Sequence, residues 1–467
     1  MKGIKSIYFI GIKGAGMSAL AILCKQQGLK VIGSDIAEIF PTDKLLEDAK
    51  IQILEGFKKE NLEVVTFDCV VISAAYGREN VEVKEAKKRK IPIYYYSEFL
   101  GKILSSKRLI SVCGIHGKTT TTAILSHILK EAGVDPGFLL GANCRNLQTT
   151  AHWGKGDFFI LESDEYRKSP DDSTSKLFDF WPEIVLITSL EMDHPDLFSN
   201  EKDIYQIFYK FITRLPRWGL VIANLDYGWL KKLKNSISDR KFETYGRALS
   251  VDWQIIGEEI APLATTFKLI HQREELGPFV LNVAGSHNID NASAAIICAL
   301  KLSVPLPTIK RALPKFKGVE RRFQLVGETP TGTKVFDDYA HHPTAIVKTI
   351  ETAKKIFPKN KIWVVFQPHT YSRTKKLLQD FAQSFQAADH VILADIFASA
   401  REKETTINIQ QLVIATRRYQ KDVRYLGKDE NISRFLKGMT KKNDIIIVMG
   451  AGDIYKIEKE LIKNDIG

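Results

Sequence analysis

A short glycine-containing turn near the middle of the chain places the strongest constraint on its fold. It reads Gly114-Ile-His-Gly117-Lys118-Thr119, follows an apolar run over residues 109–112 and precedes a helical pattern over residues 120–132. In a strand–loop–helix unit of this kind, backbone N–H groups converge on phosphate oxygens at the helix N-terminus. Lys118 would then reach the β- and γ-phosphates, and the Thr119 hydroxyl would join the shell of a Mg²⁺ ion. The turn therefore predicts an ATP-binding α/β domain.

The turn is a shortened form of the usual phosphate-binding pattern. The strict pattern G-x-x-x-x-G-K-[ST] is not met, because Val112 stands where its first glycine should be. An ordinary strand-to-helix turn would look similar, so the interpretation depends on the rest of the chain.

The length of 467 residues is too great for one core and suggests about three domains. We expect the three domains to span residues 1–105, 106–325 and 326–467. Hydrophobic and charged contents of 44% and 26% are typical of a globular protein. The sequence contains neither an apolar run of about 18 residues nor a signal-peptide pattern at its start. These features predict a cytoplasmic protein with no membrane partner.

Cysteines and net charge narrow the function classes further. The five cysteines are far apart, mostly in apolar segments and without metal-ligand spacing, which predicts reduced core thiols. A net charge of +12 would suit a nucleic-acid partner, but the basic residues are mostly dispersed. We therefore expect no nucleic acid, and note that a positive field attracts small polyanions equally well.

The first domain opens with a βαβ pattern. A strand over residues 7–10, the turn Gly11–Gly16, a helix over residues 17–27 and a strand ending before Asp35 are typical of a nucleotide-binding half-sheet. Lys13 occupies the second glycine position of the dinucleotide fingerprint, which weakens a nicotinamide interpretation. A lysine there could place a cation beside a nucleotide diphosphate, or it could be a solvated residue of a tight turn.

Two predicted strands of the central domain are followed by acidic residues. The run over residues 158–162 ends at Glu162, and the run over residues 184–188 precedes Asp193-His194. Their carboxyl ends should meet at the sheet edge where the phosphate loop lies. Mg²⁺ prefers hard oxygen ligands and usually takes one or two carboxylates beside the phosphates. Glu162 is the preferred candidate, with the His194 imidazole at the same edge.

The last domain alternates between strand and helix patterns, which predicts another doubly wound sheet. The predicted strands cover residues 334–336, 361–366, 390–393 and 445–449, and the predicted helices cover residues 344–356 and 374–387. Two polar loops at successive strand ends, one with Asp338, His341 and His342 and one with His369 and Arg373, would line a cleft. The adjacent histidines lack a matched third metal ligand, so we favour substrate positioning. Arg373 is suited to bidentate binding of a carboxylate or phosphate.

In chain order, the motifs resemble those of the Mur ligase family, and the resemblance covers nearly the whole chain. The motifs are Gly114-Ile-His-Gly-Lys118-Thr119, Glu162-x-x-Glu165, Asp193-His194, Gly285-x-His287-Asn288-x-x-Asn291-Ala292, Arg321-Arg322-Phe323 and Asp338-Tyr-Ala-His341-His342-Pro343. The resemblance implies an α/β architecture of three domains: a Rossmann-like N-terminal domain, a P-loop ATPase-like central domain and a Rossmann-like C-terminal domain.

The resemblance also implies an activity. It implies an ATP- and Mg²⁺-dependent ligase of peptidoglycan synthesis, a monomer or homodimer, that joins L-alanine to the lactoyl carboxylate of UDP-N-acetylmuramate through an acyl phosphate. An insertion between Glu165 and Trp181, with Ser175-Lys176, is instead similar to family members that add a murein tripeptide to the same sugar. Two alternative functions come from other classes of protein. Support for a nicotinamide oxidoreductase would come from the first βαβ unit alone, and support for a nucleic-acid-binding ATPase from the net charge alone.

Site residues follow from the same resemblance, position by position. It implies catalytic roles for Lys118, Glu162, His194 and Arg373, and a metal shell of Thr119, Glu162 and His194. ATP would contact Gly114, Gly117, Lys118, Thr119, Thr120, Arg322 and, at the adenine, Asn288. The substrates would contact Lys13, Gly14, Gly16, Asp35, Asp338, His341, His342, His369 and Arg373. Departures from the family pattern are Lys13, Ile115, Ser189 and Ala284, and Lys210 is a candidate for the carbamylated lysine of some relatives.

Overall fold

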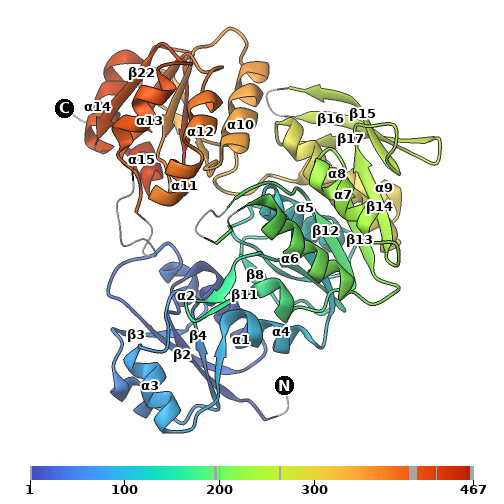
Figure 1. Cartoon of the computed structure of the whole chain (residues 1–467), viewed down its shortest axis with the longest axis vertical. Coiled ribbons are helices and arrows are strands. Elements are labelled where there is room, and N and C mark those ends of the chain that lie inside the picture. Colours follow the sequence, from blue (N-terminus) through green and yellow to red (C-terminus); the bar gives the residue numbers. More distant parts are fainter. Residues whose placement is uncertain are drawn as a thin grey trace.

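The computed structural model describes residues 3–193, 197–198, 200–261, 264–398, 407–427 and 429–462. Within these residues, three α/β units follow one another along the chain, each around its own sheet (Figure 1). No helix in this part of the chain is both long and apolar enough to cross a membrane.

The N-terminal unit is built on a parallel sheet with the strand order β3-β2-β1-β4-β5. The predicted βαβ start is confirmed, because β1 and β2 pair in parallel and α1 connects them. The strands are β1 (Ser6–Ile10), β2 (Lys30–Asp35), β3 (Gln52–Glu55), β4 (Cys69–Ile72) and β5 (Ile93–Tyr95). The helices are α1 (Ala15–Gln26), α2 (Asp43–Asp48), α3 (Val81–Lys88) and α4 (Tyr96–Leu104).

The central unit has a parallel core that positions the phosphate loop. This core has the order β14-β13-β12-β6-β9-β7, and the helix α5 (Lys118–Glu131) follows β6 directly. The strands are β6 (Arg108–Cys113), β7 (Gly137–Leu139), β9 (Phe158–Glu162), β12 (Ile184–Ile187), β13 (Leu220–Asn224) and β14 (Lys241–Gly246). The other helices are α6 (Glu201–Thr213), α7 (Gly228–Ser236), α8 (Ser286–Lys301) and α9 (Leu306–Ala312).

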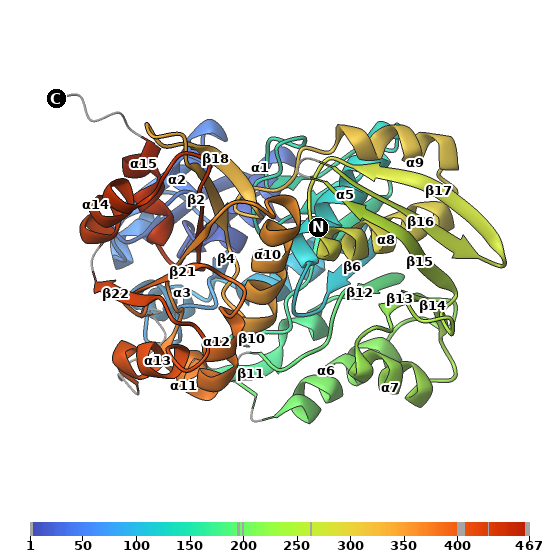
Figure 2. The ribbon, with the colours of Figure 1, turned by 90° about the horizontal axis from the view of Figure 1, so that it is seen from above.

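Additional strands extend the central sheet at both edges. The short β8 (Ala151–His152) pairs with β7, while β15 (Trp253–Ile260), β16 (Thr265–His271) and β17 (Glu274–Leu281) form an antiparallel extension beyond β14. Figure 2 shows this extension on the far side of the central unit from the C-terminal helices. A separate hairpin, β10 (Arg167–Ser169) and β11 (Asp172–Ser175), leads into the short 3₁₀ helix η2 (Lys176–Asp179).

The C-terminal unit is the predicted doubly wound sheet, with the order β18-β19-β23-β20-β21-β22. All neighbouring strands are parallel except β18, which pairs antiparallel with β19. The strands are β18 (Gln324–Glu328), β19 (Lys334–Asp338), β20 (Ile362–Phe366), β21 (His390–Ala394), β22 (Val423–Gly427) and β23 (Ile445–Met449). The helices are α10 (Pro343–Ile356), α11 (Tyr371–Lys376), α12 (Leu378–Ser384), α13 (Ile409–Thr416), α14 (Asp429–Met439) and α15 (Ile457–Ile462).

One predicted helix is wrong in its extent. The single helix expected over residues 374–387 is two helices, α11 and α12, which meet at Leu377 with φ −102° and ψ 23°. At this break the Leu377 side chain packs into the same apolar core as Phe381, so packing overrides the continuous helical pattern of the sequence.

Apolar packing joins the N-terminal unit to the central unit but does not extend to the C-terminal unit among the described residues. Leu20 and Leu23 of α1 share one core with Leu139 and Phe159 of the central sheet. The apolar clusters of the C-terminal unit, in contrast, contain only residues from 323 onward among those described. The N-terminal and central units therefore form one packed body, against which the C-terminal unit rests as a second. All five cysteines are buried and free, as predicted.

Candidate active site

A cavity of about 430 Å³ lies where the three units meet. Gly16 and Tyr96 line it from the N-terminal unit, Lys118 and Glu162 from the central unit, and His341 from the C-terminal unit. A ligand that fills this cavity therefore touches all three units at once.

The phosphate loop has a backbone that only glycine accepts easily. Gly114 and Gly117 have φ of +121° and +80°, in the region that L side chains rarely adopt. A Cβ at Gly117 would lie 2.1 Å from Oδ1 of Asn291. No side chain among the described residues caps α5, so the N–H groups of its first turn remain available for an anion.

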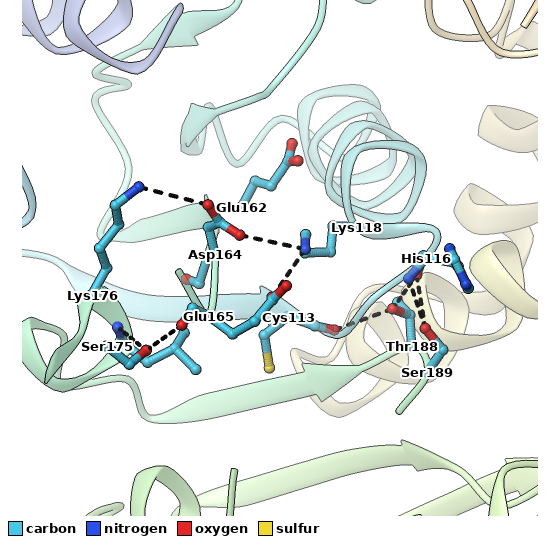
Figure 3. A network of polar contacts seen from close by, with 12 residues as sticks. Cys113, His116, Lys118, Glu162, Asp164, Glu165, Ser175, Lys176, Thr188 and Ser189 are labelled. Atoms are coloured by element: carbon cyan, nitrogen blue, oxygen red, sulfur yellow. Dashed lines mark hydrogen bonds and ion pairs between the residues drawn. The ribbon is translucent and has the colours of Figure 1, made fainter. Parts of the chain in front are cut away.

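The end of β12 fixes the loop in place, as Figure 3 shows. The His116 N–H donates to Oγ of Ser189 at 2.7 Å, and the Ile115 N–H donates to the Ser189 carbonyl at 3.3 Å. The Thr188 hydroxyl donates to the His116 carbonyl. Ser189, one of the departures from the family pattern, thus supports the loop through both its backbone and its hydroxyl.

Lys118 begins α5, and the chain's own acids hold its ammonium group (Figure 3). Its Nζ donates to Oε2 of the buried Glu165 at 3.1 Å and lies 3.8 Å from Oδ1 of Asp164. Burial lowers the pKa of Lys118, but the charges of Glu165, Asp164 and Glu162 outweigh it, so the net shift is upward. Lys118 therefore stays cationic at the mouth of the phosphate loop.

Thr119 and Glu162 come together next to Lys118. The Thr119 hydroxyl donates to Oε1 of Glu162 at 2.9 Å, and the Gly141 N–H donates to Oε2 at 2.6 Å. Burial raises the pKa of Glu162. A hydroxyl and a carboxylate are hard oxygen ligands, so this pair fits a Mg²⁺ ion. Of the other residues predicted here, Thr120 lines the cavity, and His194 lies outside the described residues.

The predicted polar loop after β19 forms the C-terminal wall of the cavity. Asp338 accepts hydrogen bonds from the Thr349 hydroxyl and the Ala340 N–H, both at 2.9 Å. His341 and His342 line the cavity. Burial lowers the pKa of His342 to about 4 and that of His341 well below its ordinary value. Both imidazoles are therefore neutral near pH 7.

Arg373 binds a carboxylate, but one that belongs to the chain. Its Nε donates to Oδ1 of Asp193 at 2.9 Å, and both side chains are almost fully buried. His369 stacks on Phe397 with ring centres 5.6 Å apart. Neither Arg373 nor His369 is among the described residues that line the cavity. The structure thus places Arg373 in a contact between the central and C-terminal units.

The Lys13 side chain is turned into the N-terminal unit. Its Nζ donates to the carbonyls of Ile36 and Glu38 at 3.1 and 2.8 Å and lies 3.3 Å from Asp43. The Lys13 N–H donates to Oδ2 of Asp35 at 2.7 Å. Of the residues expected to face the sugar nucleotide, Gly16 lines the cavity, whereas Lys13, Gly14 and Asp35 do not.

The start of α8 reaches the cavity through residues other than Asn288. The Asn288 amide donates to the Ala284 carbonyl at 2.7 Å, while His287, Asp290 and Asn291 line the cavity. Arg322 also lines it, with its guanidinium 4.9 Å from the ring centre of Tyr339. Lys210 is exposed on α6 and is not a lining residue among those described.

Glu191, at the start of the segment that ends in Asp193-His194, is a site residue to which the sequence motifs assign no role of its own. Its Oε2 lies 3.6 Å from Nε2 of His116 and accepts a hydrogen bond from the Thr344 hydroxyl at 2.8 Å. Burial raises its pKa, but the contacts to His116, Thr344 and His342 prevail, and the pKa of Glu191 falls to about 2. This anion therefore links the phosphate loop to the first turn of α10.

Comparison with known families gives three successive matches that together cover most of the chain. The model described as "Mur ligase family, catalytic domain" matches residues 6–108, and the "Mur ligase middle domain" matches residues 112–299. The model described as "Mur ligase, glutamate ligase domain" matches residues 321–452.

Individual proteins agree with these matches. The UDP-N-acetylmuramate–L-alanine ligase of Desulfitobacterium hafniense is 39% identical over 458 residues, which cover 98% of this chain and 99% of that protein. The crystal structure of the UDP-N-acetylmuramate-alanine ligase from Thermotoga maritima has a TM-score of 0.80 and 26% identity, with 98% of each chain covered. A murein peptide ligase from Psychrobacter arcticus has a TM-score of 0.73 and 27% identity over the same shares.

Proposed function

This chain belongs to the Mur ligase family, and we propose that it joins L-alanine to the lactoyl carboxylate of UDP-N-acetylmuramate, with conversion of ATP to ADP and phosphate. The observation that supports this most strongly is that the phosphate loop, Gly16 of the N-terminal nucleotide turn and the C-terminal polar loop after β19 line one cavity together. A relative of that name matches nearly the full chain at 39% identity.

Two alternatives have less support. The murein peptide ligase is similar to this chain in fold, but its TM-score of 0.73 is lower than the 0.80 of the L-alanine ligase structure, while the two identities, 27% and 26%, are nearly the same. A nicotinamide oxidoreductase would use the N-terminal unit alone. It would leave the phosphate loop and Lys118 without a role.

The chemistry explains why a carboxylate needs ATP here. A free carboxylate is a poor acyl donor, so one of its oxygens bonds to the γ-phosphorus while the bond from that phosphorus to the oxygen of ADP breaks. The amine nitrogen of L-alanine then attacks the acyl carbon, and phosphate leaves with the former carboxylate oxygen. The amine loses one proton as the amide forms.

Each wall of the cavity supplies part of this chemistry. Lys118 and the first turn of α5 would bind the β- and γ-phosphates and place them against the acid. Thr119 and Glu162 would hold Mg²⁺, which when bound neutralises phosphate charge. The neutral His341 and His342 lie on the wall that L-alanine would approach. Enclosure by three units would exclude water from the acyl phosphate.

A phosphate-release assay tests the proposal. With ATP and UDP-N-acetylmuramate, we compare L-alanine, glycine, L-serine and the murein tripeptide as acceptors, and expect release to depend on the sugar nucleotide and to be greatest with L-alanine. Lys118→Ala should abolish release while leaving sugar-nucleotide binding intact. Steady release with ATP and water alone, or a clear preference for the tripeptide, would contradict the proposal.

A further inference from the structure

Lys176 is a cavity residue to which the proposed function has so far given no role. It begins η2, directly after the β10–β11 hairpin, within the insertion that resembles family members that add a murein tripeptide. Its side chain is only 14% exposed, and it lines the cavity together with Lys118.

The Lys176 ammonium group shares a carboxylate with Lys118. Its Nζ lies 3.6 Å from Oδ2 of Asp164, and the Lys118 Nζ lies 3.8 Å from Oδ1 of the same residue. Figure 3 shows Asp164 between the two lysines. Asp164 itself is 43% exposed. Two cations therefore converge on one accessible carboxylate in the cavity, an arrangement that suits an exchangeable anion.

Lys176 lies where the N-terminal wall meets the phosphate-loop wall. Its Nζ is 6.0 Å from the ring centre of Tyr96, a residue of α4 in the N-terminal unit. A Cβ at Gly16 would lie 3.1 Å from the same ring, so the nucleotide turn is adjacent. The other Lys and Arg residues among the described lining residues are Lys118 in the phosphate loop, and Arg322 and Lys348 in the C-terminal unit.

The segment that carries Lys176 is anchored on both neighbouring units. The Ser97 hydroxyl of α4 donates to Asp179 at 2.6 Å, and the Ser175 hydroxyl donates to the Glu165 carbonyl at 2.9 Å. Lys168 of the hairpin lies 2.6 Å from Asp179. The position of Lys176 is thus set within the packed body of the N-terminal and central units.

We propose that Lys176 binds the carboxylate of the sugar-nucleotide substrate and holds it toward the phosphate loop, taking the place of its contact with Asp164. The inference rests on the proposed function, because the acid must lie between a nucleotide on the N-terminal unit and a triphosphate on the loop. Lys176 forms no covalent bond with the substrate. It is therefore a positioning and specificity residue for the acid.

Calorimetric binding without ATP tests this directly. The two ligands are UDP-N-acetylmuramate and UDP-N-acetylglucosamine, which lacks the lactoyl carboxylate. In Lys176→Gln we expect the preference for the acid to fall by about tenfold to a hundredfold, the usual effect of losing a charged hydrogen bond, with the affinity for UDP-N-acetylglucosamine unchanged. Lys176→Arg should restore most of the preference.

Lys102→Gln is the matched control, because Lys102 is an exposed lysine of α4, the helix that carries Tyr96, and does not line the cavity. It should leave the preference for the acid unchanged. The inference is overturned if Lys176→Gln keeps the wild-type preference for the acid. It is also overturned if the variant loses affinity for both sugar nucleotides equally, as a folding defect would cause. The phosphate-release assay on the wild-type protein remains separate, so either result leaves the proposed ligase activity to be judged on its own.

Discussion

At the scale of single residues, the chain's own acids neutralise cations in the cavity and beside it. Within the cavity Lys118 pairs with Glu165 and Asp164, and outside it Arg373 pairs with Asp193. Such pairs remove the cost of leaving a charge in a poorly solvated site. The acids around Lys118 also raise its pKa, so this lysine does not serve as a base near neutral pH.

A second group of buried charges, outside the cavity, leads to a prediction on pH and stability. Glu458 at the start of α15 is buried beside Asp337, and its Oε1 has no hydrogen-bond partner among the described residues. Burial, and then the charge of Asp337, raise the pKa of Glu458. The folded state therefore holds a proton that the unfolded chain releases, so the free energy of unfolding decreases as pH rises above the ordinary glutamate range.

Glu458→Gln should abolish this decrease in the free energy of unfolding at high pH, because the amide carries no charge. We expect its thermal midpoint to exceed that of the wild type near pH 8, by roughly 2–4 °C for each kcal/mol recovered, and the gap to close by about pH 5. Differential scanning calorimetry at both pH values measures it. Glu460→Gln, on the exposed side of the same helix, should change little. A difference in thermal midpoint between variant and wild type that grows toward low pH would contradict a raised pKa of Glu458.

At the scale of elements, the start of α5 depends on the glycine that precedes it. Gly117 and Gly133 flank this helix with nearly the same φ, +80° and +78°, but only Gly117 is crowded. An alanine at either position costs about 1–2 kcal/mol for the left-handed backbone. At Gly117 the new Cβ must also displace Asn291 and the loop.

Gly117→Ala should therefore lower turnover by about a hundredfold, since a displacement of the phosphate loop by an ångström misplaces the reacting groups. Gly133→Ala should lose a comparable part of its stability and keep its turnover. Steady-state kinetics and thermal unfolding on both variants make the comparison. Equal turnover in the two variants would show that the crowding at Gly117 has no functional effect.

Much of the element order was predictable because the core strands are short apolar runs bounded by turns. This holds for β6, β9 and β12, and for the strand–helix alternation of the C-terminal unit. The break at Leu377 and the antiparallel strands β15–β17 were not predicted, because long-range packing decides them. Individual motifs located the phosphate loop and the polar loop after β19. The Ser175-Lys176 pair was noted only for its resemblance to tripeptide-adding family members, and no local pattern placed Lys176 in the cavity.

Contacts between distant parts of the chain limited the prediction of the site in the same way. Asp193 and Arg373 are 180 positions apart, and Glu191 and Thr344 are 153 apart. Lys13 was expected to face a diphosphate, but the carbonyls of residues 36 and 38 bind its ammonium group. Sequence proximity does not encode any of these pairings.

At the scale of the whole molecule, the division between apolar and polar contacts indicates which unit moves. The N-terminal and central units share a core, whereas no apolar cluster of the described residues spans the central and C-terminal units, and hydrogen bonds and an ion pair join them. Polar contacts can exchange with water when the units separate. The C-terminal unit is therefore expected to open for substrates and to close for the reaction.

Arg373→Met tests this closure. Losing one partner of a buried ion pair costs about 3–5 kcal/mol, which shifts the balance between closed and open forms by about two orders of magnitude or more. Small-angle X-ray scattering without ligands should show a larger radius of gyration. Arg424→Met, at a half-exposed pair with Asp422 inside the C-terminal unit, is the control. An unchanged radius for Arg373→Met would mean that other contacts hold the units together.

We propose that the cavity passes a phosphoryl group from ATP to a sugar-borne carboxylate before the amide forms. Isotope transfer follows the carboxylate oxygens through this step. With UDP-N-acetylmuramate labelled by ¹⁸O in both oxygens of its lactoyl carboxylate, and with ATP and L-alanine unlabelled, mass spectrometry of the released phosphate should find one ¹⁸O atom per molecule. Amide product formed together with unlabelled phosphate would contradict the account.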